Sequence, residues 1–141
     1  MKLSIIIPDK NKEGDIKETL NKILNNLVIS NIKHEIIIFS DYSKDSTLQI
    51  SNSSEKIINT LKIIINTGKP GFGLAIKQGL ESYNGDFIAI VMVDGSDSPE
   101  DVIKFYFKSA QNNASIFGTR FSNEGDIKDY PAVKYVMNRV F

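Results

Sequence analysis

Short, mostly apolar runs alternate along this chain with longer segments in which apolar residues recur at helical spacing. The runs cover Leu3–Ile7, Glu35–Phe39, Leu61–Ile65 and Phe87–Val93, and each is rich in β-branched residues. Runs of this length and composition predict strands. The uninterrupted run Phe87–Val93 indicates a strand that is buried on both faces, as in a parallel sheet. A further short strand is expected at Ser115–Phe117.

The segments between these runs carry the apolar stripes of amphipathic helices. In the first segment the stripe consists of positions 16, 20, 23, 24, 27 and 28, a spacing typical of a helix with one buried face. Similar patterns predict helices that begin near Phe72 and at Ser98–Pro99, and cap-forming residues within 43–47 predict another. Strands that alternate with helices favour parallel βαβ units with right-handed crossovers. We therefore predict a single α/β domain over residues 1–141, with a mostly parallel sheet and helices on both faces.

A last apolar stripe, at Val133, Val136, Met137 and Val140, predicts a helix over residues 130–141. Two interpretations of this helix stay open. It docks on the domain that precedes it, or the sequence stops partway through a larger fold. We favour the second interpretation, and therefore expect a fold that is truncated at its C-terminus.

The composition is typical of a globular protein and limits the classes of partner that it can be expected to bind. Hydrophobic residues make up 41% of the chain, charged residues make up 24%, and 17 basic residues balance 17 acidic ones. Zero net charge does not favour nucleic acid as a partner, because nucleic-acid binders show a basic excess or stripe. No apolar run approaches the roughly 20 residues that span a bilayer, and no signal peptide is recognisable after Met1. We expect a cytoplasmic protein, which leaves open a peripheral contact with a membrane surface.

Three of the predicted strands end in polar, acidic loops. The loops occupy residues 8–13, 40–42 and 94–97. Because parallel strands end at one edge of the sheet, where ligands bind in open α/β folds, the three loops are expected to converge. A single loop of this kind is better explained as a turn, but three together favour a ligand site.

The loop after Phe87–Val93 is the candidate metal site. Asp94 and Asp97 put two carboxylates on one short loop, and carboxylates suit Mg²⁺ or Mn²⁺ held against a phosphate. Zinc is disfavoured, because the chain has no cysteine and a single histidine, His34, which is expected near the opposite edge of the sheet. The glycine-rich segment 66–73 could bring backbone amides to a phosphate, but it is about equally well explained as a turn that starts a helix.

Taken in order, these segments resemble the family-2 glycosyltransferases, which have a GT-A fold, and among them the polyprenyl-phosphate sugar synthases. SIIIPDKNKE resembles the first strand and loop of that family, and FSDYSKDST resembles its VDDGSTDGT segment. NTGKPGFGLAIKQGL resembles its glycine-rich loop and helix, IVMVDGSDSPED resembles its metal-binding segment, and GTRF resembles its G[ST]R motif. The likeness covers nearly the whole chain.

The resemblance implies a Rossmann-like GT-A sheet that binds a UDP- or GDP-linked sugar. The sugar would be transferred with inversion to a lipid phosphate, such as a polyprenyl phosphate at the cytoplasmic face of a membrane, or to a glycan of the cell envelope. The residues that the resemblance places around the nucleotide are Pro8, Asn11, Glu13, Asp41, Gly71 and Gly73.

The resemblance also implies the residues that meet the diphosphate. Asp94 would bind Mg²⁺ or Mn²⁺, with Asp97 as a second ligand. Arg120 would hold an anionic acceptor or the donor phosphates, a task that suits a guanidinium fork.

The metal-binding segment departs from the family pattern at one position. Aligned on Pro99-Glu100, Asp94 takes the second aspartate of the DxD motif, and Met92 takes the first. Methionine is not a ligand for a hard cation, so either Asp97 compensates or a single aspartate suffices. The main alternative hypothesis is therefore a truncated, non-catalytic nucleotide-sugar-binding module.

Two other classes are less well supported by the residues. A sugar nucleotidyltransferase would show a glycine-rich, basic loop after its first strand, and PDKNKEG is not such a loop. A receiver-like signalling domain shares acidic strand ends, but no matching phosphoacceptor arrangement is recognisable.

Overall fold

The computed structural model describes residues 1–9, 16–41, 59–66, 69, 71–92 and 97–118. Four strands and three helices lie within these ranges. In chain order they are β1 (Lys2–Asp9), α1 (Ile16–Ile29), β2 (Lys33–Asp41), β3 (Leu61–Asn66), α4 (Phe72–Ser82), β4 (Phe87–Ile90) and α5 (Pro99–Asn112). Each matches an element that the sequence pattern predicts. The predicted helix start within 43–47 and the helix over 130–141 lie outside the described residues.

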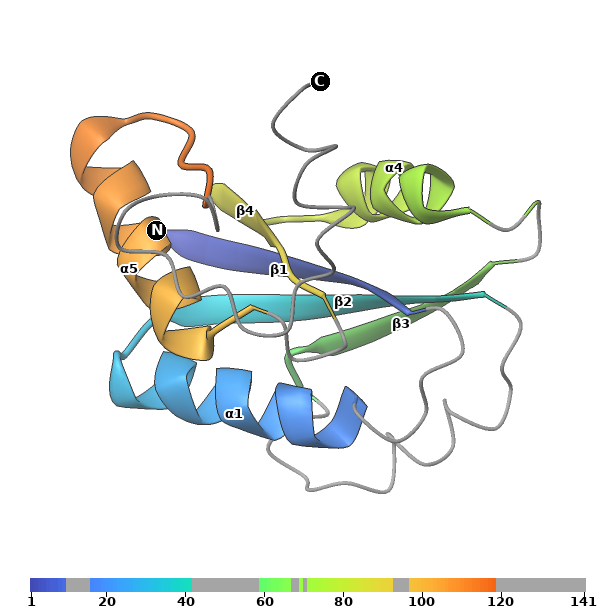
Figure 1. The fold of residues 1–141 in the computed structure, drawn as a ribbon, viewed down its shortest axis with the longest axis horizontal. Helices are drawn as coiled ribbons and strands as arrows, with labels where there is room; N and C mark the ends of the chain where they lie inside the picture. Colours follow the sequence, from blue (N-terminus) through green and yellow to red (C-terminus); the bar gives the residue numbers. More distant parts are fainter. Residues whose placement is uncertain (10–15, 42–58, 67–68, 70, 93–96, 119–141) are drawn as a thin grey trace, which may run out of the picture.

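The four strands form one parallel sheet with the order β3-β2-β1-β4. The chain moves outward from β1 to β2 and β3, and then returns through α4 to place β4 on the other side of β1. Figure 1 shows α1 and α5 on one face of the sheet and α4 on the other. The predicted α/β architecture, with helices on both faces, is confirmed.

The core lies on both sides of the two central strands. On one face, Leu3, Ile5 and Ile7 of β1 pack with the apolar stripe of α1. On the other face, Ile6 is also fully buried, and α4 approaches it through Gly79, where an added methyl group would lie 2.6 Å from Ile6 Cγ2. Burial of both faces explains why the sequence of β1 is a continuous apolar run.

The prediction that Phe87–Val93 is a strand buried on both faces is wrong. β4 ends at Ile90, and burial alternates along it, with Ile88 38% and Ile90 48% exposed. The reason is the position of β4 at the end of the described sheet. Phe87 and Ala89 pack against the core, whereas on the opposite face α4 packs over β1 and β2.

The prediction of a strand at Ser115–Phe117 is also wrong. Residues 115–118 have no regular secondary structure, and Phe117 is 88% exposed. α5 ends with Asn113 in the left-handed conformation, and both Asn113 and Ala114 donate their amides to the carbonyl of Ser109. This tight helix end leads into a segment that pairs with none of the described strands.

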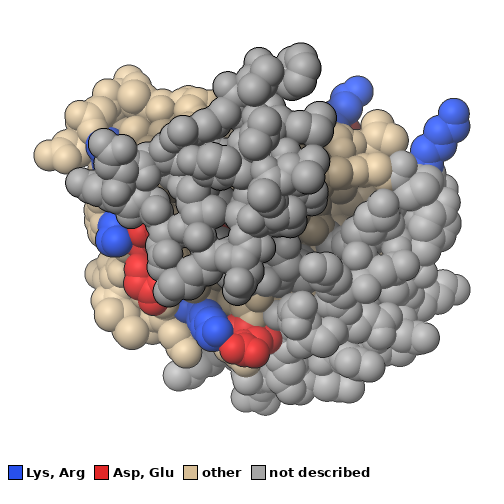
Figure 2. Space-filling view, viewed as in Figure 1, with Lys and Arg blue, Asp and Glu red and all other residues tan. Residues whose placement is uncertain are grey.

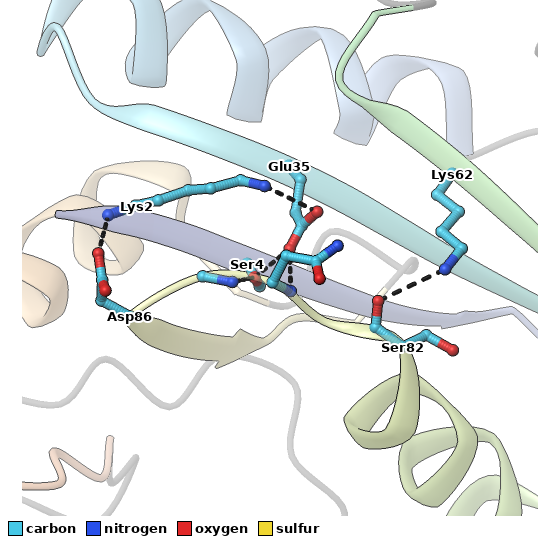
Figure 3. Close-up of polar contacts among 8 residues, drawn as sticks. Lys2, Ser4, Glu35, Lys62, Ser82 and Asp86 are labelled. Atoms are coloured by element: carbon cyan, nitrogen blue, oxygen red, sulfur yellow. Dashed lines mark hydrogen bonds and ion pairs between the residues drawn. The ribbon is translucent and has the colours of Figure 1, made fainter.

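A buried carboxylate ties the turn between α4 and β4 to the start of the sheet (Figure 3). Glu35 of β2 accepts hydrogen bonds from the Ser4 hydroxyl over 2.5 Å, from the Asn84 amide over 2.6 Å and from Lys2 Nζ over 2.9 Å. Burial raises the pKa of the Glu35 carboxyl, but these donors and the charge of Lys2 outweigh burial and lower the pKa to about 2. The carboxylate is therefore held in its charged form.

The same turn closes onto β1. The Gly85 amide donates to Ser4 Oγ over 2.9 Å, and Asp86 accepts a hydrogen bond from the Lys2 amide over 2.7 Å. A methyl group at Gly85 would lie 2.5 Å from Ser4 Oγ and 2.8 Å from the Lys2 carbonyl oxygen. The approach of the two backbones therefore requires glycine at this position.

The charged side chains are interleaved on the described surface. Lys22 pairs with Glu18 along α1, and Lys104 pairs with Asp101 along α5. On the described part of the face that Figure 2 shows, acidic and basic side chains lie next to one another. Within the described ranges, no helix combines the length and hydropathy that crossing a membrane requires.

Candidate functional site

The carboxyl ends of three neighbouring strands meet at one edge of the sheet. Asp9, the last residue of β1, is in register with Ser40 of β2. Asp41, the last residue of β2, is in register with Asn66 of β3. The strand ends that precede the first two acidic loops therefore lie side by side, as predicted for parallel strands.

The third acidic loop leaves the sheet beside β1. Just past β4, the amide of Val91 donates to the Ile6 carbonyl over 3.0 Å, and the Val91 side chain is buried. The next amide, that of Met92, donates to Oδ2 of Asp97 over 2.8 Å. The two described residues that flank the loop are thus joined directly to each other.

Asp97 is followed at once by the start of α5. The Ser98 side chain caps this helix by accepting a hydrogen bond from the Asp101 amide over 3.4 Å, and Pro99 opens the helix. The predicted cap is therefore confirmed. Val102, one turn further on, is buried in the core, so Asp97 lies between the end of the sheet and a helix that is packed on it.

The two glycines assigned to donor binding lie at the start of α4. The Gly71 carbonyl accepts a hydrogen bond from the Ala75 amide over 2.9 Å. A methyl group at Gly71 would make an ordinary contact of 3.8 Å with Leu74, and one at Gly73 would meet none of the described atoms within 4 Å. Packing among the described residues therefore does not require glycine at either position, and their assignment to the nucleotide stays a prediction.

The remaining predicted site residues divide into two groups. Pro8 is buried in β1, in register with Phe39, and Asp41 ends β2 at the edge described above. Four lie outside the described residues, and their roles stay predictions: Asn11, Glu13, Asp94 and Arg120. In the part of the chain that the structure describes, no group of three or more His, Cys, Asp or Glu residues could hold a metal ion.

Sequence reasoning treats Asp97 as a second metal ligand and Met92 as a lost one, and it misses the hydrogen bond that joins them. The bond depends on where β4 stops pairing with β1, which the continuous apolar run does not reveal. One signal is available in the sequence. Asp97 directly precedes the Ser98–Pro99 helix start, a position where short polar side chains often bond to nearby backbone amides.

Comparison with known proteins identifies relatives along nearly the whole chain. Dolichol-phosphate mannosyltransferase of Pyrococcus furiosus is 27% identical over 141 residues, which cover 99% of this chain and 39% of the relative. The chain therefore spans about two fifths of the length of that protein.

Solved structures share the fold. S. aureus TarS in complex with UDP-GlcNAc superposes with a TM-score of 0.59 at 25% identity, covering 92% of this chain and 37% of that one. Glucosyl-3-phosphoglycerate synthase from Mycobacterium tuberculosis, in complex with Mn²⁺, UDP and phosphoglyceric acid, gives a TM-score of 0.56 at 18% identity, covering 77% and 38% of the two chains.

The sequence pattern of a single family agrees with the observed fold and with these relatives. That pattern, described as Glycosyl transferase family 2, matches residues 4–139. The match extends from β1 across every described element and includes all the acidic loops. The chain belongs to glycosyl transferase family 2 and has the GT-A type of α/β fold.

Proposed function

We propose that this chain is the donor-binding part of a glycosyltransferase that moves a sugar from a nucleoside diphosphate to an acceptor, with inversion and with help from a divalent cation. The observation that carries the proposal is the family match over residues 4–139, on a sheet whose strand ends lie together at one edge. TarS binds UDP-GlcNAc in its structure, which supports a nucleotide sugar as the donor here.

The acidic loop that follows β4 suits a hard cation. Its carboxylates are oxygen donors of the kind that hold Mg²⁺ or Mn²⁺ with substrate phosphates, and a fold relative was solved with Mn²⁺ and UDP. Asp94 would hold the cation, which supplies charge neutralisation on the leaving diphosphate. Asp97, the second predicted ligand, has one carboxylate oxygen engaged with the Met92 amide.

The protein's own residues would bind and orient the donor. Pro8 and Asp41 lie at the carboxyl edge of the sheet, and Asn11 and Glu13 follow β1 in sequence, so these four residues would surround the nucleotide. The loop with Gly71 and Gly73 would add backbone contacts. Arg120 would fix a phosphate of the donor or of the acceptor through a two-pronged hydrogen bond.

A lipid phosphate is the acceptor class that we propose first. The relative named dolichol-phosphate mannosyltransferase supports it, and so does the chemistry. A phosphate oxygen is already anionic and needs no strong general base, whereas a neutral hydroxyl of a glycan does. A lipid acceptor would place the protein at the cytoplasmic face of a membrane.

Sugar transfer can be tested with radiolabelled UDP- and GDP-sugars, Mn²⁺ and a short-chain polyprenyl phosphate. We expect label to pass into the organic phase in a time-dependent manner. Label in an aqueous glycan product would indicate a glycan acceptor instead. The second candidate function is a non-catalytic nucleotide-sugar-binding module, which methionine at position 92, in the DxD motif, supports. Donor binding without any transfer would favour this second candidate.

A further inference from the structure

Asp97 occupies a position where its side chain joins two rigid parts of the fold. On one side, Val91 is buried and bonded to β1, so the chain is fixed up to the Met92 amide. On the other side, Asp97 directly precedes the capped and packed first turn of α5. The 2.8 Å hydrogen bond from the Met92 amide to Asp97 Oδ2 closes the link between them.

This amide is the first beyond β4 that is bonded outside the sheet. The Val91 amide still donates to the Ile6 carbonyl of β1, whereas the Met92 amide donates to a side chain instead. Met92 is partly buried, so its amide depends on Asp97 as acceptor, because a poorly solvated amide without a partner is costly.

We propose that Asp97 is a positioning residue: by holding the Met92 amide it fixes the two described residues between which Asp94 lies in sequence, and it acts on the cation through Asp94 rather than as a ligand. This inference rests on the proposed function, in which Asp94 holds the cation. The link at residue 92 is made by its backbone amide and does not involve the methionine side chain.

The two possible roles of Asp97, hydrogen-bond acceptor and metal ligand, require different properties of its side chain. A hydrogen-bond acceptor needs an oxygen at the right place, which the amide of asparagine also supplies at almost the same size. A carboxylate ligand of a hard divalent cation also contributes a negative charge, whereas asparagine offers only a neutral carbonyl oxygen and is the weaker ligand. Asp97→Asn therefore keeps the positioning role and weakens the ligand role, while Asp97→Ala removes both.

The test compares the wild type, Asp97→Asn and Asp97→Ala, with Ser98→Ala as the matched control. Ser98→Ala removes the cap of α5 and lowers stability, but it leaves the bond between Asp97 and Met92 in place. The affinity for UDP and for GDP with Mn²⁺ is measured by calorimetry well below each melting temperature. Exchange of the Met92 amide is measured by NMR in the same proteins.

We expect Asp97→Asn and Ser98→Ala to bind within about threefold of the wild type, and Asp97→Ala to bind at least about tenfold more weakly, with faster Met92 exchange. Equal losses in Asp97→Asn and Asp97→Ala would overturn the inference in favour of a ligand role. Wild-type affinity in Asp97→Ala would overturn it as well. A wild type without any metal-dependent binding would contradict the proposed function itself, while Met92 exchange would still decide whether Asp97 holds this segment.

Discussion

At the residue scale, the best-defined electrostatic feature is Glu35, which lies at the start of the sheet and away from the candidate site. The residue is 9% exposed, and its carboxylate accepts hydrogen bonds from β1 and from the turn between α4 and β4. Its pKa of about 2 in the folded protein lies below the usual value of 4.5. The folded state therefore binds this proton less tightly than the unfolded state does.

This difference predicts how stability depends on pH. The contribution of Glu35 is fully present above pH 4.5 and is lost as the pH falls from about 4.5 to about 2. The free energy of unfolding should therefore be lower in Glu35→Gln than in the wild type at pH 7, by up to about 3 kcal/mol. Urea titrations of both proteins from pH 7 to pH 2 should show the difference shrinking. A difference that is constant with pH would contradict the lowered pKa.

At the scale of elements, the hydrophobic pattern predicts where a strand lies in the sequence, but not which strands and helices lie beside it in the fold. Ile5, Ile6 and Ile7 are all fully buried, so the continuous run of β1 belongs to a strand that is covered on both faces. The run of β4 looks the same, yet Ile88 and Ile90 are exposed, because a run does not reveal which strand ends a sheet or where a helix lies over it.

The packing of α4 on the sheet yields a prediction with an internal control. A methyl group at Gly79 would lie 2.6 Å from Ile6 Cγ2, whereas one at Gly73 would meet none of the described atoms within 4 Å. Gly79→Ala should lower the free energy of unfolding by about 1–3 kcal/mol through overpacking.

Gly73→Ala, in the same helix, should leave stability unchanged or raise it by up to about 1 kcal/mol, because alanine favours helix more than glycine does. Urea denaturation of the two variants measures both effects. Similar values for the two variants would mean that α4 does not approach β1 as closely as the structure indicates.

The candidate site shows the same division between what sequence can and cannot predict. Strand ends determine where the acidic loops begin, so Asp9 and Asp41 could be placed at one edge from the alternation of strands and helices. The contact between Asp97 and Met92 could not, because it depends on the residue at which β4 leaves β1. Asp94 and Arg120 lie outside the described residues, and their roles stay predictions.

At the scale of the whole molecule, the sheet, its helices and the family match point to one edge as the place of ligand binding. The match to glycosyl transferase family 2 runs from residue 4 to residue 139, although the chain spans only 39% of the mannosyltransferase that it resembles. The proposed donor binding at this edge of the sheet can be measured separately from sugar transfer.

The most direct test of this account is the melting temperature of the wild type and of Asp94→Asn, measured with UDP- and GDP-linked sugars in the presence and absence of Mn²⁺. A ligand that binds only the folded state raises the melting temperature. We predict that one donor raises it in the wild type when Mn²⁺ is present, and that the rise is lost without Mn²⁺ and in Asp94→Asn. No rise with any donor would contradict the account, and a rise in Asp94→Asn equal to that of the wild type would contradict the role of Asp94.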